Sequence, residues 1–177
     1  AAIAPVTINP PMLAVLEAAE RVSRASGGAF DVTVGPLVRL WGFKDKRLHV
    51  PSPEELTGVR GTVNFRNVVI DRGAHTVRFA RPGVQIDLGG IAKGFAVEVA
   101  AESLRRRNLS GVVDAGGNQF MVGLPPGKGQ WAIGISHPDL PGRLLGVLSI
   151  TDGALSTSSD ASNFLAADGR RYGHILD

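Results

Sequence analysis

The spacing of apolar and polar residues changes abruptly near the middle of the chain. Val84 to Leu88 alternates between apolar and polar positions, which predicts a strand whose polar face carries Asp87. After Gly89 and Gly90 the apolar residues recur at helical spacing and fall on one predicted face: Ile91, Ala92, Phe95, Ala96, Val99, Ala100 and Leu104. The two glycines predict a tight turn, in which the backbone can approach a ligand closely.

A second long helix and several hairpins are predicted elsewhere. The two prolines before Met12 suit a helix start, and Gly27-Gly28 predicts its end. Strands are predicted at Ile3–Ile8, Val68–Asp71, Thr76–Phe79, Gly111–Asp114, Trp131–Ile135, Leu144–Ile150, Phe164–Ala167 and Tyr172–Leu176. Ala154–Ser159 is rich in small and hydroxyl residues, and its part from Ser156 to Ser159 favours a turn with capping hydroxyls over a nucleophile site. Hairpins with two long helices indicate an α+β fold with antiparallel sheets packed against the helices.

The segment between the first predicted helix and the first predicted hairpin begins with mostly apolar residues, and its second half is mostly polar. The large side chains between Ala29 and Phe43 are Phe30, Leu37, Trp41 and Phe43, and we expect most of these four to be core. This stretch contains one carboxylate, Asp31. Ser52 is a candidate N-cap for a short helix that opens at Pro53.

Composition narrows the class of protein. The 177 residues suit one domain with a sizeable core, and 44% hydrophobic and 20% charged residues are ordinary for a globular protein. The net charge of +3 suits a small anionic ligand, whereas nothing indicates a nucleic-acid partner. The sequence has no apolar run of membrane-spanning length. It has no cysteine, which excludes disulfides, thiolate metal sites and a cysteine nucleophile.

The glycine turn before the central helix is a candidate anion site. Free N–H groups and the helix dipole favour an anion at a helix N-terminus. Lys93 lies in the predicted first turn, where its charge opposes the dipole unless an anion is bound. A solvated lysine on the polar helix face is the competing interpretation. The turn lacks the spacing of a dinucleotide-binding fingerprint.

One of the four histidines is a candidate general base. His174 lies at the end of an apolar strand, three residues before Asp177, and an imidazole can take a proton from a hydroxyl near neutral pH. A hydrogen-bonded core histidine remains the alternative. His49, His75 and His137 lie in polar or Pro/Gly-rich loops, so we expect them to be exposed.

Four stretches together resemble the FAD:protein FMN transferase (ApbE) family, and they occur in the family's order. They are Gly28–Phe43, Asp87–Gly94, Asp114–Asn118 and Tyr172–Asp177. The resemblance implies a T-fold-like α+β core and a Mg²⁺-dependent flavin site. It also implies a bacterial protein of the periplasm or the outer face of the inner membrane, a lipoprotein whose lipid anchor would lie outside this chain.

The family cleaves the pyrophosphate of FAD, transfers FMN to a Thr or Ser of an acceptor flavoprotein subunit, and releases AMP. Some members instead hydrolyse FAD to FMN and AMP, as a FAD pyrophosphatase. A non-catalytic flavin-binding module is the third alternative. By resemblance, the catalytic base is His174, the metal ligand is the main-chain carbonyl of Gly90, and the FAD-contacting residues are Ala29, Phe30, Asp31, Asp87, Lys93 and Leu176.

The sequence also departs from the family pattern. We do not find the family's flavin-stacking aromatic before Ile3, and the family's further metal ligands come after the position of Asp177. Ser158-Ser159-Asp160 replaces the commoner Ser-Gly-Asp. We therefore expect a single flavin-transferase domain trimmed at both ends. For the 177-residue chain alone we expect weak FAD binding, little enhancement by Mg²⁺ and no measurable FMN transfer.

Overall fold

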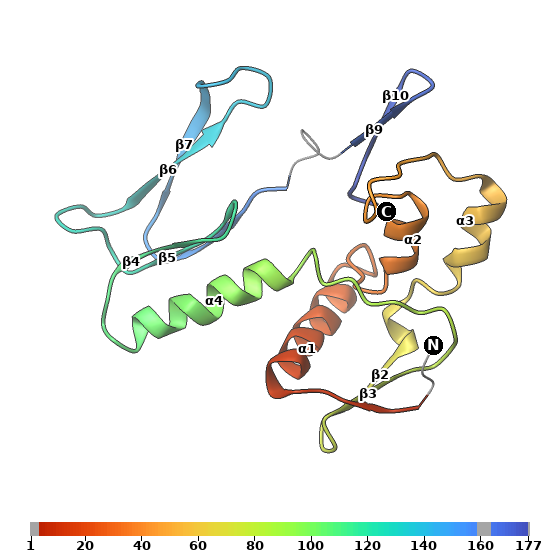
Figure 1. Cartoon of the computed structure of the whole chain (residues 1–177). Helices are drawn as coiled ribbons and strands as arrows, with labels where there is room; N and C mark the ends of the chain where they lie inside the picture. Colours follow the sequence, from red (N-terminus) through yellow and green to blue (C-terminus); the bar gives the residue numbers. More distant parts are fainter. Residues whose placement is uncertain (1–3, 159–163, 177) are drawn as a thin grey trace. The chain divides into compact units, whose positions relative to one another are not determined.

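The computed structural model describes residues 4–158 and 164–176, which form helices and small antiparallel sheets (Figure 1). The mixed α+β class predicted from sequence is confirmed. The chain divides into two compact units, Ala1–Ile91 with Ser162–Asp177, and Ala92–Ala161. A single domain over the whole chain stays a prediction. The predicted features that involve Ile3, Ser159, Asp160 and Asp177 lie outside the described residues.

The first unit is built on a three-stranded antiparallel sheet. Its order is β1 (Val6–Thr7), β3 (Thr76–Phe79), β2 (Val68–Asp71), so the predicted hairpin is confirmed and the predicted first strand is shorter. The buried core cluster consists of Ala19, Val32, Phe65 and Val68. Side chains that are far apart in the sequence therefore meet in one core.

Helix α1 (Pro10–Ala25) begins and ends as its sequence predicts. The Asn9 side chain caps the N-terminus by accepting a hydrogen bond from the Met12 amide. At the other end Gly27 has a φ of 64°, and the Gly28 amide donates to the Ser23 carbonyl at 2.8 Å. This is a Schellman-type ending, for which glycine is suited because it has no Cβ.

Two shorter helices follow. Helix α2 (Gly35–Leu40) was not predicted, because its glycine, proline and β-branched residues are weak helix formers. Helix α3 (Pro53–Arg60) was predicted, and Ser52 and Glu55 form a full capping box at its start. A 3₁₀ turn, η1 (Phe65–Asn67), then leads into β2.

The last hairpin of the first unit pairs β9 (Phe164–Ala167) with β10 (Arg170–Gly173). Its two-residue loop has φ values of 50° at Asp168 and 68° at Gly169, the left-handed backbone that such loops require. The predicted second strand, Tyr172–Leu176, is therefore wrong in its bounds, because the two-residue loop places the strand start at Arg170.

The strand predicted at Val84–Leu88 is wrong. This segment is extended, but it makes only an isolated parallel bridge between Gln85 and Val34, supplemented by a hydrogen bond of 2.7 Å from the Asp87 amide to the Val32 carbonyl. The partner segment turns into α2 at Gly35, so the ladder cannot continue. The alternation of apolar residues correctly predicted an extended backbone. A strand also needs a neighbouring segment that stays extended over several residues, so that a ladder of hydrogen bonds can form.

The second unit contains α4 (Ala92–Arg105) and two antiparallel sheets. One sheet has the order β4 (Gly111–Asp114), β5 (Asn118–Val122), β8 (Gly153–Ser156), and the other pairs β6 (Trp131–Ser136) with β7 (Leu144–Ile150). Helix α4 packs against β5 and β4 (Figure 1). The predicted helix is confirmed, whereas β5 and β8 were not predicted.

The predicted apolar face of α4 is not the buried one. The buried residues of this helix are Val97 and Ala101, while Val99 is 57% exposed. Alanines extend the apolar stripe of α4 in both directions around the helix, so the sequence does not determine which face of the helix is buried. Packing against β4 and β5 selects the buried face. No helix in the described part of the chain is both long and apolar enough to cross a membrane.

Candidate functional site

The glycine turn that precedes α4 is held by two neighbouring side chains. Asp87 accepts a hydrogen bond of 2.8 Å from the Gly89 amide through Oδ1. A Cβ added at Gly90 would lie 3.1 Å from Cε2 of Phe30, and one at Gly89 would lie 3.0 Å from Oδ1 of Asp87. Neither glycine adopts the left-handed backbone. Glycine is therefore favoured here by close packing rather than by an unusual φ.

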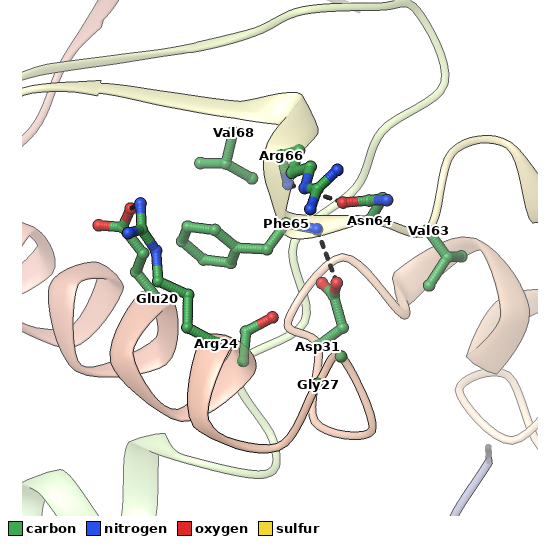
Figure 2. Close-up of a pocket in the computed structure, with 11 residues that line it drawn as sticks. Glu20, Arg24, Gly27, Asp31, Val63, Asn64, Phe65, Arg66 and Val68 are labelled. Carbon is green, nitrogen blue, oxygen red and sulfur yellow. Dashed lines mark hydrogen bonds and ion pairs between the residues drawn. The ribbon is translucent and has the colours of Figure 1, made fainter.

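Asp31 uses both carboxylate oxygens within the protein. Its Oδ1 accepts hydrogen bonds from the amide of Thr33 at 2.8 Å and from its hydroxyl at 2.7 Å. Its Oδ2 accepts from the Phe65 amide at 2.6 Å, as Figure 2 shows. Thr33 is fully buried and Phe65 is 8% exposed. Asp31 therefore braces the loop after α1 against η1, whatever contact it makes with a ligand.

The other predicted flavin residues of the first unit differ in exposure. Ala29 is exposed, and Phe30 is half-buried against the core cluster. The Phe30 amide donates to the Ser26 hydroxyl at 3.0 Å, which ties it to the end of α1. Leu176 is half-buried and follows β10. The expectation that Phe30 is a core residue is correct only in part, since one side of it remains accessible.

An open pocket of about 900 Å³ lies beside Asp31 in the first unit (Figure 2). The end of α1, the Gly27-Gly28 turn and the segment from Val63 to Val68 line it. Glu20 and Arg24 form an ion pair of 2.7 Å on its wall. Opposite charges alternate around the pocket, so its walls do not select an anion or a cation. Asp31 lines this pocket, and the other described residues that were predicted to form the flavin site do not.

His174 lies against aromatic side chains from a distant part of the sequence. Its ring centroid is 6.4 Å from that of Phe43, with an interplanar angle of 69°. Trp41 packs 5.2 Å from Tyr172 and 6.4 Å from Phe43, again between centroids. All of these rings are half-buried. Trp41 and Phe43 belong to the set of which most members were expected to be core, but they are only half-buried. Phe43 packs on the predicted base, and Trp41 packs on Tyr172.

The remaining histidines differ in exposure. His49 is exposed as predicted, 3.9 Å from Glu55. His75 and His137 are half-buried, so the prediction for these two is wrong. The Nδ1 atom of His137 accepts a hydrogen bond of 3.1 Å from the Asp139 amide, which holds the ring against its own loop.

Lys93 belongs to the second unit. It lies exposed in the first turn of α4, where the sequence predicted it. The same unit contains the second glycine turn, in which Gly116 and Gly117 have φ values of 59° and 85°. Asp114 closes this turn by accepting hydrogen bonds from the Gln119 side chain at 2.7 Å and from the Gly117 amide at 3.1 Å.

The hydrogen bonds to Asp114 predict that the stability of the protein depends on pH in the acidic range. The Gln119 side chain, followed by the Gly117 amide, lowers the pKa of Asp114 below the usual 3.8. A carboxylate with a lowered pKa adds stability that is fully present above pH 3.8 and is lost as the pH falls through its folded pKa. We expect Gln119→Leu to raise the pKa of Asp114 toward 3.8, as measured by NMR titration. Gln130→Leu, in an exposed loop, is the control, and an unchanged pKa in Gln119→Leu would contradict the assignment.

The oxygen donors of the glycine turn provide at most part of a magnesium shell. Mg²⁺ prefers six oxygen ligands in octahedral geometry, usually with one or two carboxylates. In the glycine turn, the oxygen atoms that could bind a metal are the main-chain carbonyl of Gly90 and the carboxylate of Asp87, which are three residues apart in the sequence. Within residues 4–158 and 164–176, no group of three or more histidine or acidic side chains could hold a metal ion. The described donors alone therefore do not complete a magnesium site.

Sequence comparisons identify relatives along the entire chain. A sequence model described as the ApbE family matches residues 1–177. The FAD:protein FMN transferase of Treponema pallidum is 36% identical over 189 residues, covering 98% of this chain and 52% of that protein. The protein of the same name from Vibrio cholerae is 34% identical over 177 residues, with 98% and 52% coverage. The chain spans about half the length of these curated relatives.

Structural comparison gives the same family. The ApbE protein of Thermotoga maritima matches with a TM-score of 0.89 and 36% identity, over 98% of this chain and 57% of that one. The flavin transferase ApbE from Vibrio cholerae matches with a TM-score of 0.82 and 33% identity, over 99% and 56%. Because the family model matches every residue and the structural relatives cover nearly all of them, this chain belongs to the ApbE family.

Proposed function

We propose that the native protein transfers FMN from FAD to a Thr or Ser side chain of an acceptor protein and releases AMP. The observation that carries this proposal is that curated relatives named FAD:protein FMN transferase align with 98% of the chain at up to 36% identity. The acceptor is proposed to be a flavoprotein subunit, and no nucleic acid takes part.

The proposed reaction is a phosphoryl-group transfer. The hydroxyl oxygen of the acceptor attacks the phosphorus atom that bears riboflavin, and a new phosphoester bond forms. The bond between that phosphorus and the bridging oxygen breaks, and AMP leaves with the electron pair. His174 takes the proton of the attacking hydroxyl, since histidine is the most common general base in proteins and the family resemblance assigns it that role.

The glycine turn and the start of α4 supply features that suit a pyrophosphate. The turn is held by Asp87 and Phe30, and it leads directly into the N-terminus of a 14-residue helix. Unpaired N–H groups at a helix N-terminus attract anions, and Lys93 adds a positive charge in the first turn. Asp31 serves the same site indirectly, because it holds the loop that carries Ala29 and Phe30.

Magnesium would neutralise negative charge on the pyrophosphate when bound. We propose the Gly90 carbonyl as one of its ligands, and the rest of its shell has no assignment among the described residues. On the same resemblance we propose that the protein has a T-fold-like core. We also propose a bacterial protein at the periplasmic side of the inner membrane, anchored by a lipid outside this chain.

The function is tested by following both products of FAD cleavage. The native protein is incubated with FAD, Mg²⁺ and the proteins of a membrane extract of its host. AMP is quantified by chromatography, and covalently bound flavin is detected by fluorescence in a denaturing gel. AMP with a fluorescent protein band supports transfer, AMP with free FMN indicates the pyrophosphatase alternative, and flavin binding without AMP indicates a binding module.

Removing the charge of Lys93 should weaken FAD binding without changing stability. A hydrogen bond to a charged group contributes about 1.5–3 kcal/mol, so Lys93→Ala should raise the Kd for FAD by about 10- to 100-fold. Because Lys93 is exposed and its interaction with the helix dipole is small, the melting temperature should change little. Isothermal titration with FAD measures the first effect and thermal unfolding the second.

Lys128→Ala is the matched control for Lys93→Ala, since Lys128 is also an exposed lysine of the second unit. Its Kd for FAD should equal that of the wild type. If Lys93→Ala also keeps the wild-type Kd, Lys93 is a solvated residue of the helix surface, which is the alternative that the sequence left open.

A further inference from the structure

Two segments of the first unit face one another through their aromatic rings. Each segment contributes two rings that are two residues apart in the sequence. Trp41 packs on Tyr172, with centroids 5.2 Å apart, and Phe43 packs on His174, with centroids 6.4 Å apart. The rings of Trp41 and Phe43 also contact each other at 6.4 Å. The residue assigned as the base is therefore the last ring of a continuous aromatic cluster formed by Trp41, Phe43, Tyr172 and His174.

The loop that carries Trp41 and Phe43 has little conformational freedom. Helix α2 ends in a Schellman motif, in which the Gly42 amide donates to the Arg39 carbonyl at 2.9 Å and the Phe43 amide donates to the Val38 carbonyl at 3.2 Å. Gly42 has a φ of 75°, and a Cβ there would lie 2.1 Å from the Arg47 carbonyl oxygen. Only glycine fits this position, so the backbone direction of Phe43 is determined by the end of α2.

The hairpin on the other side determines where His174 lies. The two-residue loop at Asp168-Gly169 pairs Arg170 with Ala167 and Tyr172 with Leu165. Strand β10 ends at Gly173, so His174 is the first residue after the strand and lies two positions beyond Tyr172. Packing of Tyr172 on Trp41 then brings His174 to Phe43.

We propose that Phe43 is a positioning residue for the His174 imidazole. Its ring meets the imidazole at an angle of 69° and so limits the orientations that the imidazole can adopt. This inference rests on the proposed function, in which His174 accepts the proton of the acceptor hydroxyl. A general base works only while its nitrogen is aligned with the proton that it takes, and small misplacements cost large factors in rate.

The first test separates the effects on rate and on binding. We expect Phe43→Leu to lower kcat for AMP release about tenfold with an unchanged KM for FAD. Phe43→Tyr keeps a ring at this place and should retain most of the wild-type kcat. Phe79→Leu is the matched control, because Phe79 is a half-buried phenylalanine of the same unit that packs against the core cluster. It should lower stability and leave kcat unchanged.

The second test asks whether Phe43 acts through His174. In a His174→Ala background, adding Phe43→Leu should not lower the residual rate further, because the side chain that Phe43 orients is absent. A further tenfold loss in the double variant would show that Phe43 supports the site by another route and would overturn the proposal. A wild-type kcat in Phe43→Leu would overturn it as well.

A third measurement does not depend on turnover. In nuclear Overhauser spectra, the contacts of the His174 ring protons with side chains other than residue 43 should change in Phe43→Leu and stay the same in Phe79→Leu. If the wild type releases no AMP from FAD, the proposed function fails, and these contacts still decide whether Phe43 orients the imidazole. If the wild type is active and the contacts of the His174 ring do not change in Phe43→Leu, only the positioning role is refuted.

Discussion

Replacing His174 by alanine should reduce FMN transfer by about 10²- to 10⁴-fold, the usual contribution of a general base. FAD binding should be retained, because the imidazole acts on the acceptor hydroxyl and not on the bound nucleotide. AMP release measures the rate, and titration with FAD measures binding. His49→Ala, at an exposed histidine of the same unit, is the control and should keep the wild-type rate.

A different outcome would separate the two roles that the sequence left open for His174. If His174→Ala loses affinity and rate to the same extent, with a lower melting temperature, the histidine is a structural member of the aromatic cluster. If the rate stays within a factor of about two of the wild type, which is far smaller than a general-base effect, another group accepts the proton.

Replacing Asp31 by alanine should lower the free energy of unfolding by about 3 kcal/mol. Three hydrogen bonds to one carboxylate are lost, and hydrogen bonds to charged groups contribute about 1.5–3 kcal/mol each, less when neighbouring groups rearrange to find water. The Phe65 amide and the buried Thr33 hydroxyl lose their acceptor. Urea denaturation monitored by circular dichroism measures the change.

Asp71→Ala is the control for Asp31→Ala. Asp71 is also an aspartate of the first unit, and its Oδ1 accepts a hydrogen bond of 2.9 Å from the Ala74 amide. It is exposed, so its loss should cost about 1 kcal/mol or less. If Asp31→Ala keeps wild-type stability but loses FAD binding, Asp31 is a direct ligand contact, as the family resemblance implies, and its hydrogen bonds are incidental.

Much of the fold could be predicted because it depends on local rules. The β2–β3 hairpin, the start of α1 at its prolines and the Ser52 N-cap of α3 follow from backbone preferences of a few adjacent residues. The two-residue loop at Asp168-Gly169 likewise follows from glycine and aspartate at positions of positive φ. Such signals need no knowledge of the rest of the chain.

The errors arise where two distant segments must meet. Val84–Leu88 has the pattern of a strand, but its partner turns into α2 and allows one bridge only. The broad apolar stripe of α4 is compatible with several orientations, and packing on β4 and β5 buries Val97 and Ala101. Strand β5 was missed because it begins directly after the glycine turn. Its first residue, Asn118, was assigned to that turn.

The sequence by itself determined the family, the class of fold, both ends of α1, the start of α3 and the residues proposed for the site. Its motifs and turn residues are local, and they are legible without coordinates. Only the tertiary structure decided what those residues do for one another. Asp31 braces η1, Phe30 packs on Gly90, and Phe43 meets His174. These contacts join residues far apart in the chain, and their formation depends on packing between elements, which no local pattern encodes.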